Sequence, residues 1–577
     1  MRRATIAILF LLGCSGAHDD SASSEDREPS RLARSLQNGA RDTLQSDARD
    51  TLQSGARDTL QSGATSDEVA NPTLTLQLID RDGNPPTSSF VAVTDLNTAR
   101  NVFERNVSGG TLEIPLPEGR YGVAVFITTP GPGGAKSGTY ANLPSLAIHA
   151  NTARTLDARL GKRVSVSLDE PSAKQKSATV FLAQPTARGN VQFPSFPSPL
   201  DSLDKDAIYA VPSEPAKGFA FYVQTVWTRG GQEESPYVYH LLSSTADRVP
   251  EQPAYRVRKF ELARVRVNLA AQGVDWKDEI AYALSTPVLE LTGLRVSMGD
   301  GARVTFPGTR TDYFTPGAWS FAVHQGASGV ASTSVAEAVY ARPGEYRQTW
   351  NTAPLGPSFP GASPYYAPVV REGDILNVSI PMYSEAEPGH INDPYVTVTG
   401  SMILRRGDEV IAQSDDVGSL FRKGSPVTVP PERATYELTS HGVRNVPWSL
   451  YATEQTVTWR FASEHTSARA ALPLMAVRYA PKLDAYGRAP AGRRATFDIR
   501  VEHNAGASAK VATLRIFVSH DDGARWEPAD VWRCADGWRA SVRHPADADF
   551  VSLRAEAVDL DGNAVEQTLI RAHGLSH

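Results

Sequence analysis

Cys14 is the residue whose type and position most directly indicate chemistry. It follows the charged start Met1-Arg2-Arg3, an apolar run from Ala4 to Leu12 and the small residue Gly13. These features describe an export signal, and its roughly 10 apolar residues are too few for a bilayer that needs about 20. We therefore predict that this segment is removed. The thiol of Cys14 is a soft nucleophile that can accept a thioether-linked glyceride where the cut is made.

The segment Leu11-Leu12-Gly13-Cys14 resembles the lipobox of bacterial lipoproteins. The resemblance implies that 1–13 is a lipoprotein signal peptide and that Cys14 becomes the lipid-carrying first residue of the mature chain. Each buried methylene contributes about 0.8 kcal/mol, so several acyl chains hold a protein almost permanently. The membrane is thus an expected partner, and the expected location is the extracellular face of the bacterial membrane or the outer membrane. An ordinary secretory signal that happens to contain a cysteine is the alternative.

Residues 14–70 are rich in Ser, Asp, Arg, Gln and Gly and contain an octapeptide repeat. The three copies begin at Ala40, Ala48 and Ala56 and read Ala-Arg-Asp-Thr-Leu-Gln-Ser followed by Asp or Gly. Leucines spaced by eight residues are displaced by about 80° from one another on a helix, so they form no apolar stripe. With one apolar anchor per repeat, this segment is predicted to be a disordered tether.

Composition sets the outer limits on function. The chain has 577 residues, 41% of them apolar and 21% charged, with a formal net charge of -6. A chain of this length holds several domains, and without a strong basic block it gives no electrostatic reason to expect a nucleic-acid partner. The only cysteines are Cys14 and Cys534, so acylation of Cys14 leaves no internal disulfide. Cys534 is interpreted as a small buried hydrophobe.

Beyond position 70 the apolar residues alternate with polar ones. Leu74, Leu76 and Leu78 alternate in this way, and so do Val265, Val267 and Leu269 with Arg264, Arg266 and Asn268. Such alternation places one face of a strand on a core and the other in water. The 44 glycines and 40 prolines supply turns between the runs. We predict an all-β fold of tandem β-sandwich domains, transthyretin-like or Ig-like, after the tether.

Five domain ranges are predicted, namely 71–161, 162–260, 261–351, 352–480 and an Ig-like or fibronectin-like sandwich at 481–577. The first contains Thr73 to Pro85, which ends in an Asp-Gly turn, and later Leu116-Pro117-Glu118-Gly119-Arg120-Tyr121. This pairing resembles the transthyretin-like carboxypeptidase regulatory domains. The resemblance implies a β-sandwich and no activity.

Several short segments resemble a larger family. They look like the C-terminal accessory region that lies downstream of the catalytic domain in large secreted actinobacterial subtilisin-like serine peptidases. The matching segments are Thr152–Arg159, Thr305–Thr311, Trp350–Pro357, Thr456–Phe461 and Val551–Leu575.

The family's catalytic motifs are missing from the chain. A subtilisin-like enzyme needs an Asp, a His in His-Gly-Thr and a Ser in Gly-Thr-Ser-Met-Ala-x-Pro. His441-Gly442-Val443 lacks the threonine, and Thr399-Gly400-Ser401-Met402 has the wrong order. The resemblance therefore implies a non-catalytic accessory protein carried on its own anchor.

Ser519, Asp521, Gly523 and Trp526 fit the Asp-box Ser-x-Asp-x-Gly-x-x-Trp. We interpret this motif as a structural hairpin, in which Asp and Gly shape the turn and Trp packs below it. A sialidase propeller would repeat the motif in each blade, and one clear copy is present. Two Asp-x-Asp-Gly-Asn segments, from Asp80 and Asp559, lack the Gly and Glu of a calcium loop and are interpreted as turns. We predict no metal ligands and no cofactor.

Two classes of function stay open at this stage. The first is a non-catalytic surface protein that binds an extracellular protein, for example a peptidase, or a polysaccharide. The second is a glycan-active hydrolase whose paired carboxylates come from different domains and leave no sequence motif. We favour the first, because the catalytic motifs that we compared with the sequence are incomplete in it, whereas the structural motifs are present.

Overall fold

The computed structural model describes residues 71–193, 203–277, 281–289, 294–295, 300–327, 330–361, 366–393, 398–420, 427–504 and 510–577. The predicted signal peptide 1–13, the lipidation site Cys14 and the tether 14–70 lie outside these residues. Helices in the described part are the short 3-10 turns η1 (Pro132–Gly134), η2 (Ala158–Leu160) and η4 (Lys259–Glu261), and strands make up the rest of the regular structure. The predicted all-β fold is confirmed. None of the described helices has the length and apolarity needed to span a membrane.

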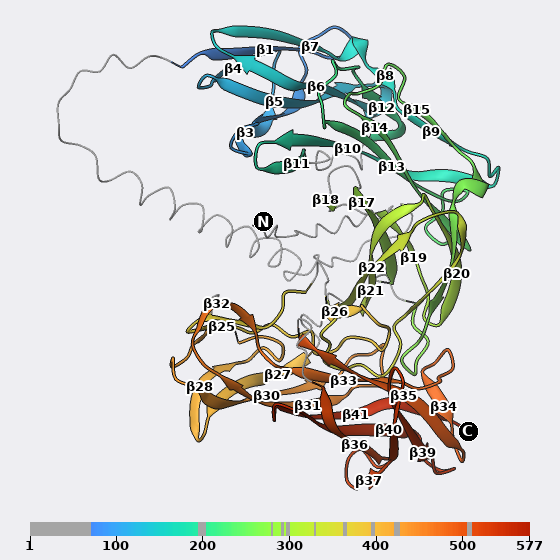
Figure 1. The fold of residues 1–577 in the computed structure, drawn as a ribbon. Coiled ribbons are helices and arrows are strands. Elements are labelled where there is room, and N and C mark those ends of the chain that lie inside the picture. Colours follow the sequence, from blue (N-terminus) through green and yellow to red (C-terminus); the bar gives the residue numbers. More distant parts are fainter. Residues whose placement is uncertain are drawn as a thin grey trace, which may run out of the picture. The chain divides into compact units, whose positions relative to one another are not determined.

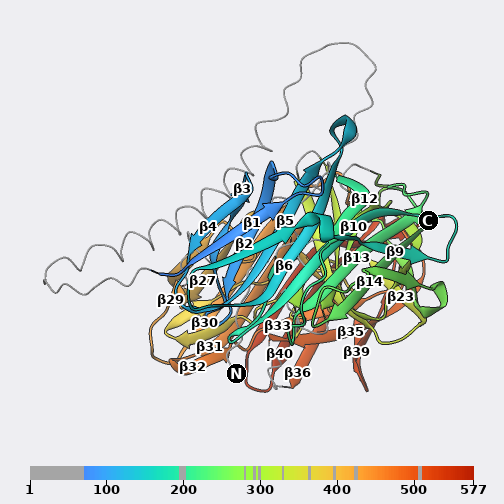
Figure 2. The same cartoon turned by 90° about the horizontal axis from the view of Figure 1, so that it is seen from above.

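The chain folds into two compact units. The first contains the residues up to Val164 together with Leu182–Phe221 and Thr245–Pro253, and the second contains Ser165–Phe181, Tyr222–Ser244 and Ala254–His577. Three of the five boundaries fall within long strands, β10 (Ala173–Thr186), β13 (Ala220–Arg229) and β14 (Tyr237–Ala246). These strands are neighbours in one sheet and can be followed side by side in Figure 2.

The first unit is a sandwich of two sheets. Its strands are β1 (Thr73–Ile79), β2 (Ser88–Asp95), β3 (Arg100–Val107), β4 (Thr111–Pro115), β5 (Gly119–Pro130), β6 (Lys136–Ile148), β7 (Thr152–Asp157), β8 (Lys162–Arg163) and β12 (Leu203–Ala210). Strand β11 (Gly189–Phe193) pairs with β10 in a different sheet. The sheets have the orders β4-β1-β7 and β3-β2-β5-β6-β12-β8. Leu74, Leu76 and Leu78 of β1 form one core with Val123 and Val125 of β5. The alternation along β1 therefore places its leucines between the two sheets.

The first strands of the second unit include those that surround one aromatic core. They are β9 (Ser165–Leu168), β15 (Ala254–Val257), β16 (Ala263–Leu269), β17 (Tyr282–Leu289), β18 (Leu294–Arg295), β19 (Asp300–Arg303), β20 (Gly308–Phe314), β21 (Gly317–Ala327), β22 (Val330–Tyr340), β23 (Gly344–Trp350) and β26 (Ile391–Asp393). One sheet contains β14-β20-β16-β23 in that order, and another has the order β18-β17-β21-β22-β26. Val265 and Val267 of β16 share a core with Trp319, Phe321 and Trp350.

The remaining strands of the second unit build three further sheets. They are β24 (Val370–Gly373), β25 (Ile375–Asn377), β27 (Val398–Arg406), β28 (Glu409–Ser414), β29 (Val427–Thr428), β30 (Ala434–Arg444), β31 (Glu454–Ser463), β32 (Thr466–Ala471), β33 (Met475–Ala480), β34 (Arg488–Pro490), β35 (Arg494–His503), β36 (Val511–Ser519), β37 (Glu527–Pro528), β38 (Asp530–Cys534), β39 (Gly537–Arg543), β40 (Phe550–Asp559) and β41 (Ala564–Ser576). The orders are β29-β25-β24-β32, β28-β27-β30-β31-β41-β40-β36-β37 and β33-β35-β39-β38. The middle of the longest sheet appears in orange and red in Figure 1.

The sheets do not stop at the predicted domain boundaries. Strands of 162–260 pair with strands outside that range, as β12 does with β6 and β14 does with β20. The ranges 352–480 and 481–577 share one core, which includes Leu404, Trp459, Ile516 and Leu553. Strand β31 pairs with β41 between them. Residues 481–577 therefore complete a core that the preceding range begins.

Candidate functional site

The Asp-box residues lie in the hairpin between β36 and β37. The Ser519 hydroxyl donates to Asp521 Oδ1 at 2.8 Å and accepts the backbone N–H of Gly523 at 2.9 Å, and Asp521 Oδ1 also accepts the N–H of Arg525 at 2.9 Å. Gly523 has a φ of +89°, and a Cβ there would lie 3.5 Å from the ring of Trp526. The carboxylate and the hydroxyl are thus used to hold the turn.

Asp80 and Asp559 build the same kind of turn. Oδ1 of Asp80 accepts the backbone N–H groups two and four residues later, at 2.9 and 2.8 Å. Asp559 makes the equivalent bonds with the same lengths. A glycine with φ near +85° follows in each turn, at Gly83 and Gly562. In the described part of the chain, no group of three or more His, Cys, Asp or Glu side chains is arranged to hold a metal ion.

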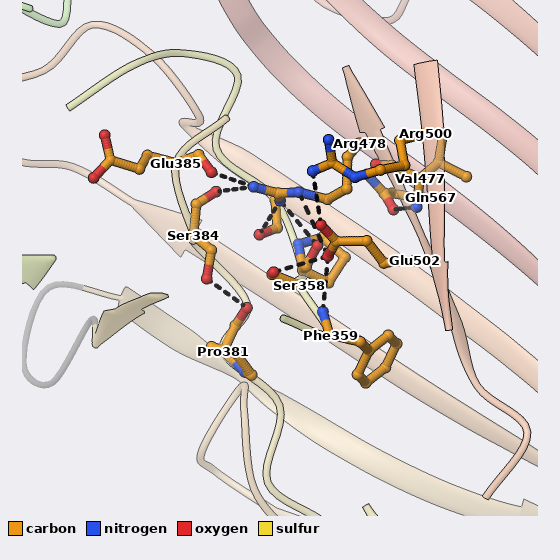
Figure 3. A network of polar contacts seen from close by, with 12 residues as sticks. Ser358, Phe359, Pro381, Ser384, Glu385, Val477, Arg478, Arg500, Glu502 and Gln567 are labelled. Atoms are coloured by element: carbon orange, nitrogen blue, oxygen red, sulfur yellow. Dashed lines mark hydrogen bonds and ion pairs between the residues drawn. The ribbon is translucent and has the colours of Figure 1, made fainter. Parts of the chain in front are cut away.

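Arg478 of β33 is the centre of a buried polar network (Figure 3). Its side chain is 4% exposed. Nη1 donates to the carbonyls of Gly356 and Pro357, both at 2.9 Å, and Nη2 donates to those of Ser384, at 3.2 Å, and Glu385. Because four backbone carbonyls from two loops converge on one guanidinium, Arg478 ties both loops to the strand.

Glu502 of β35 completes this network. Its Oε2 lies 3.9 Å from Arg478 Nε and accepts the hydroxyl of Ser358 at 2.9 Å and the N–H of Phe359 at 3.0 Å. Burial raises the pKa of Glu502, but the charge of Arg478 and the hydrogen bonds outweigh burial, so the pKa is lowered. Both oxygens of the Glu502 carboxylate therefore accept hydrogen bonds from other groups of the chain.

A second buried ionic group lies on the core side of β20. Arg310 binds Asp312 through two hydrogen bonds of 2.7 and 2.8 Å, and His240 Nε2 lies 3.8 Å from the same carboxylate. His240 stacks on Phe314 with ring centroids 4.7 Å apart. The three charged or titratable side chains are at most 6% exposed. This acid and base are enclosed, and their partners are one another.

The opposite face of the same sheet carries exposed charges. In β16, Val265 and Val267 point to the core, whereas Arg264 and Arg266 are exposed. Strand β23 runs parallel to β16, with Glu345 opposite Arg264 and Arg347 opposite Arg266. Both residues of β23 are exposed. On the other side of β16, Thr311 of β20 stands opposite Arg266, and Thr309 stands opposite Asn268.

These side chains line a polar hollow of about 800 Å³, which we call the basic basin. The basic basin is defined by Arg264, Arg266, Thr309, Thr311, Glu345 and Arg347. Arg264 Nη1 forms an ion pair of 3.0 Å with Glu345 Oε1. Within the described ranges, Arg266 and Arg347 have no carboxylate partner. The basin therefore holds two uncompensated positive charges on adjacent strands.

Arg310 borders the hollow, but its side chain lies on the core side of the sheet, where it binds Asp312. Its Nη1 is buried and has no hydrogen-bond partner in the described part of the chain. Since an unsatisfied charged donor costs free energy, this atom destabilises the core and is not part of the exposed surface of the basin.

The residues of the basic basin were not identified from the sequence as a site. The alternation around Val265 and Val267 correctly places Arg264 and Arg266 in water. The register that brings Arg347 beside Arg266 joins residues 81 positions apart and has no local sequence signal. A run of Arg and Glu that alternates with apolar residues in both segments is the sequence signal that could have suggested a charged sheet face.

Comparison with known proteins leaves the chain without a family. No protein-family model matches it, and no curated protein matches it. An adhesin candidate from Bacteroides ovatus is similar at 8% identity over 49% of this chain and 89% of its own, with a TM-score of 0.10. Escherichia coli alpha-2-macroglobulin activated by porcine elastase is similar at 11% identity over 87% of this chain and 53% of its own, with a TM-score of 0.14. The four N-terminal Ig domains of Dscam1 isoform 1.9 are similar at 10% identity over 72% of this chain and 98% of their own, with a TM-score of 0.11. At these TM-scores the likenesses carry no argument about this chain.

Proposed function

We propose that this protein is a surface-anchored binding protein. A lipid on Cys14 holds it at the extracellular face of the membrane or at the outer membrane, and the basic basin binds an extracellular macromolecule. The observation that carries the proposal is the side-by-side placement of Arg266 and Arg347 on an exposed sheet face, where neither has a carboxylate partner among the described residues. Two free guanidinium groups in one hollow offer several hydrogen-bond donors to a ligand.

The placement of the acids and bases also supports binding rather than hydrolysis. Glu502 binds Ser358, Phe359 and Arg500, and Asp312 binds Arg310. A glycosidase needs two carboxyl groups that face the substrate across a cleft. The buried carboxylates described here face other parts of the chain, and the exposed hollow is lined mainly by arginine and threonine.

The likeness to the accessory region of subtilisin-like peptidases makes a secreted peptidase one protein partner to test. Extracellular polysaccharide is the other partner class. In either case the tether would separate the sheets from the membrane, so that the basin can reach ligands beyond the lipid headgroups. A flexible chain of about 57 residues has an r.m.s. reach of roughly 40 Å.

A binding and turnover experiment tests this proposal. The full-length chain in detergent is incubated with cell-envelope polysaccharide, with a panel of purified polymers and with the secreted peptidase, and both retention and product release are measured. We expect saturable retention of at least one of these ligands without release of reducing ends or peptides. Saturable turnover of a glycan or a peptide would contradict the proposal, and so would retention of none of them.

A further inference from the structure

We infer that the ligand of the basic basin is an acidic polysaccharide, whose carboxylate or sulfate groups are bound by Arg266 and Arg347. This inference rests on the proposed function and specifies its ligand. It is argued from the charges, the spacing and the polarity of the basin.

The charges of the basin call for an anion. Its exposed ionic groups are three arginines and Glu345, and Glu345 pairs with Arg264 at 3.0 Å. Arg266 and Arg347 stay uncompensated and stand opposite each other on adjacent strands. Like charges placed opposite each other destabilise a sheet, and a bound anion would remove that repulsion.

The spacing of the two arginines fits an oxyanion. Neighbouring strands lie about 4.8 Å apart, so two guanidinium groups from opposite positions can bind one carboxylate or two successive anionic groups of a polymer. Arginine offers a planar fork of donors that matches a carboxylate or a sulfate.

The remaining residues fit sugar hydroxyls. Thr309 and Thr311 line the basin, Thr311 stands opposite Arg266, and Asn268 stands opposite Thr309 next to the basin. Their hydroxyl and amide groups both donate and accept hydrogen bonds, as sugar hydroxyls do. A hollow of about 800 Å³ is also much larger than a single inorganic anion. An extended, hydroxylated and anionic ligand uses the whole surface.

The aromatic rings of this face argue against nucleic acid. Single-stranded nucleic acids bind by stacking bases on exposed aromatic rings. On this sheet, Tyr239 and Tyr313 stack on each other at 4.4 Å and are buried, at 0% and 9% exposure. Tyr346 borders the basin, but it is half-buried and packs against the core. An acidic protein would be expected to add an apolar interface core. The arginines and threonines that line the basin match neither class as well as they match a polyuronate or a sulfated glycan.

Three polymers test the inference on the full-length protein. Polygalacturonate carries carboxylates, dextran sulfate carries sulfates and dextran carries no charge. We expect binding to polygalacturonate or dextran sulfate at least tenfold tighter than to dextran, weakening as salt is raised. The double variant Arg266→Ala/Arg347→Ala should lose at least tenfold in this affinity. The matched control Arg469→Ala/Arg543→Ala removes two exposed arginines elsewhere in the same unit and should bind as the unmodified chain does.

A charge reversal separates binding from folding. Arg347→Glu would place a carboxylate opposite Arg266, in the same arrangement as Glu345 opposite Arg264. We expect this variant to melt at the same or a higher temperature than the unmodified protein and to lose acidic-polymer binding. Loss of binding by Arg347→Glu could then not be caused by unfolding.

Three results would overturn the inference. The first is equal loss of acidic-polymer binding in the basin variant and the matched control. The second is undiminished binding in Arg347→Glu. The third is tighter binding to single-stranded DNA than to either acidic polymer. If the chain binds dextran or a peptidase but neither acidic polymer, this inference fails while the proposed function stands. If it binds none of the ligands, both fail.

Discussion

His520 Nε2 lies 3.1 Å from His544 Nδ1, so one of these two imidazoles donates a hydrogen bond to the other. The ring of His544 in turn lies edge-on to His573, with centroids 6.0 Å apart. Burial is the main cause that lowers the pKa of His544 and His573 to about 4, and for His544 the neighbouring histidines act in the same direction. Burial also lowers the pKa of His520. The folded protein therefore keeps His544 and His573 neutral well below pH 6.5.

The cluster predicts that mild acid destabilises the second unit. An unfolded histidine has a pKa of about 6.5 and takes up a proton between pH 7 and 5, whereas His573 does so only near pH 4. Since the unfolded chain binds more protons in this window, the free energy of unfolding falls as the pH falls, by about 2 kcal/mol for the fully buried His573. Urea unfolding at pH 7 and 5 measures this change.

A histidine variant identifies the source of the pH dependence. His544→Gln should show a smaller difference between its urea midpoints at pH 7 and 5 than the unmodified chain. His441 is exposed and paired with Glu454 at 3.0 Å, so His441→Gln serves as the control and should retain the full difference. Equal midpoints at the two pH values in the unmodified protein would contradict the prediction.

Arg478 is predicted to be essential for the stability of the second unit. Arg478→Met removes the guanidinium donor from the carbonyls of Gly356, Pro357 and Glu385, while Glu502 keeps Arg500 as a basic partner at 2.9 Å. Because the freed carbonyls stay buried, the variant should lose about 3 kcal/mol of stability. Arg478→Lys keeps the charge but cannot reach all four carbonyls, so its loss should be smaller. Arg469 is exposed, and Arg469→Met should change stability by less than about 0.5 kcal/mol. Denaturant midpoints that are equal for the two Met variants would contradict this role.

The Asp-box hairpin is predicted to need its glycine for two reasons. Gly523 has a φ of +89°, and a Cβ there would come within 3.0 Å of Ile570 Cδ1. Gly407 also has a positive φ, +60°, but a Cβ there meets nothing within 4 Å. Both Gly→Ala variants lose the conformational advantage of glycine, about 1 kcal/mol. Gly523→Ala should lose more because of the contact with Ile570, and differential scanning calorimetry of the two variants compares them directly.

The sequence predicted those features that depend on neighbouring residues. The alternation around Leu74 and Leu76 marked a strand because a side-chain period of two is a local property, and both leucines are fully buried. The Asp-box turn likewise depends on residues within one hairpin. The pairing of β16 with β23 and of β31 with β41 depends on strand register between distant segments, which no local pattern encodes. For that reason the basin and the shared core of 352–480 and 481–577 became visible only in the folded chain.

Cys14 can be tested independently of the folded units. Cys14→Ser removes the thiol that would carry the lipid, so the protein should leave the membrane pellet and appear in the soluble or secreted fraction. Fractionation followed by immunoblotting measures this. Cys534→Ser is the matched control, because it removes the other cysteine of the chain and should leave the protein in the pellet. Retention of both variants in the membrane fraction would remove the anchor from the proposal.

The pairing of β31 with β41 also has a consequence for how the second unit reaches its native state. The two strands are contributed by residues 454–460 and 564–570, and they join the halves of the longest sheet. Until the residues near 570 have been synthesised, the edge of β31 that pairs with β41 has no partner and can pair with other chains. A protein exported before it folds would avoid presenting that edge in the cytoplasm, whereas premature folding of a partial chain would invite aggregation.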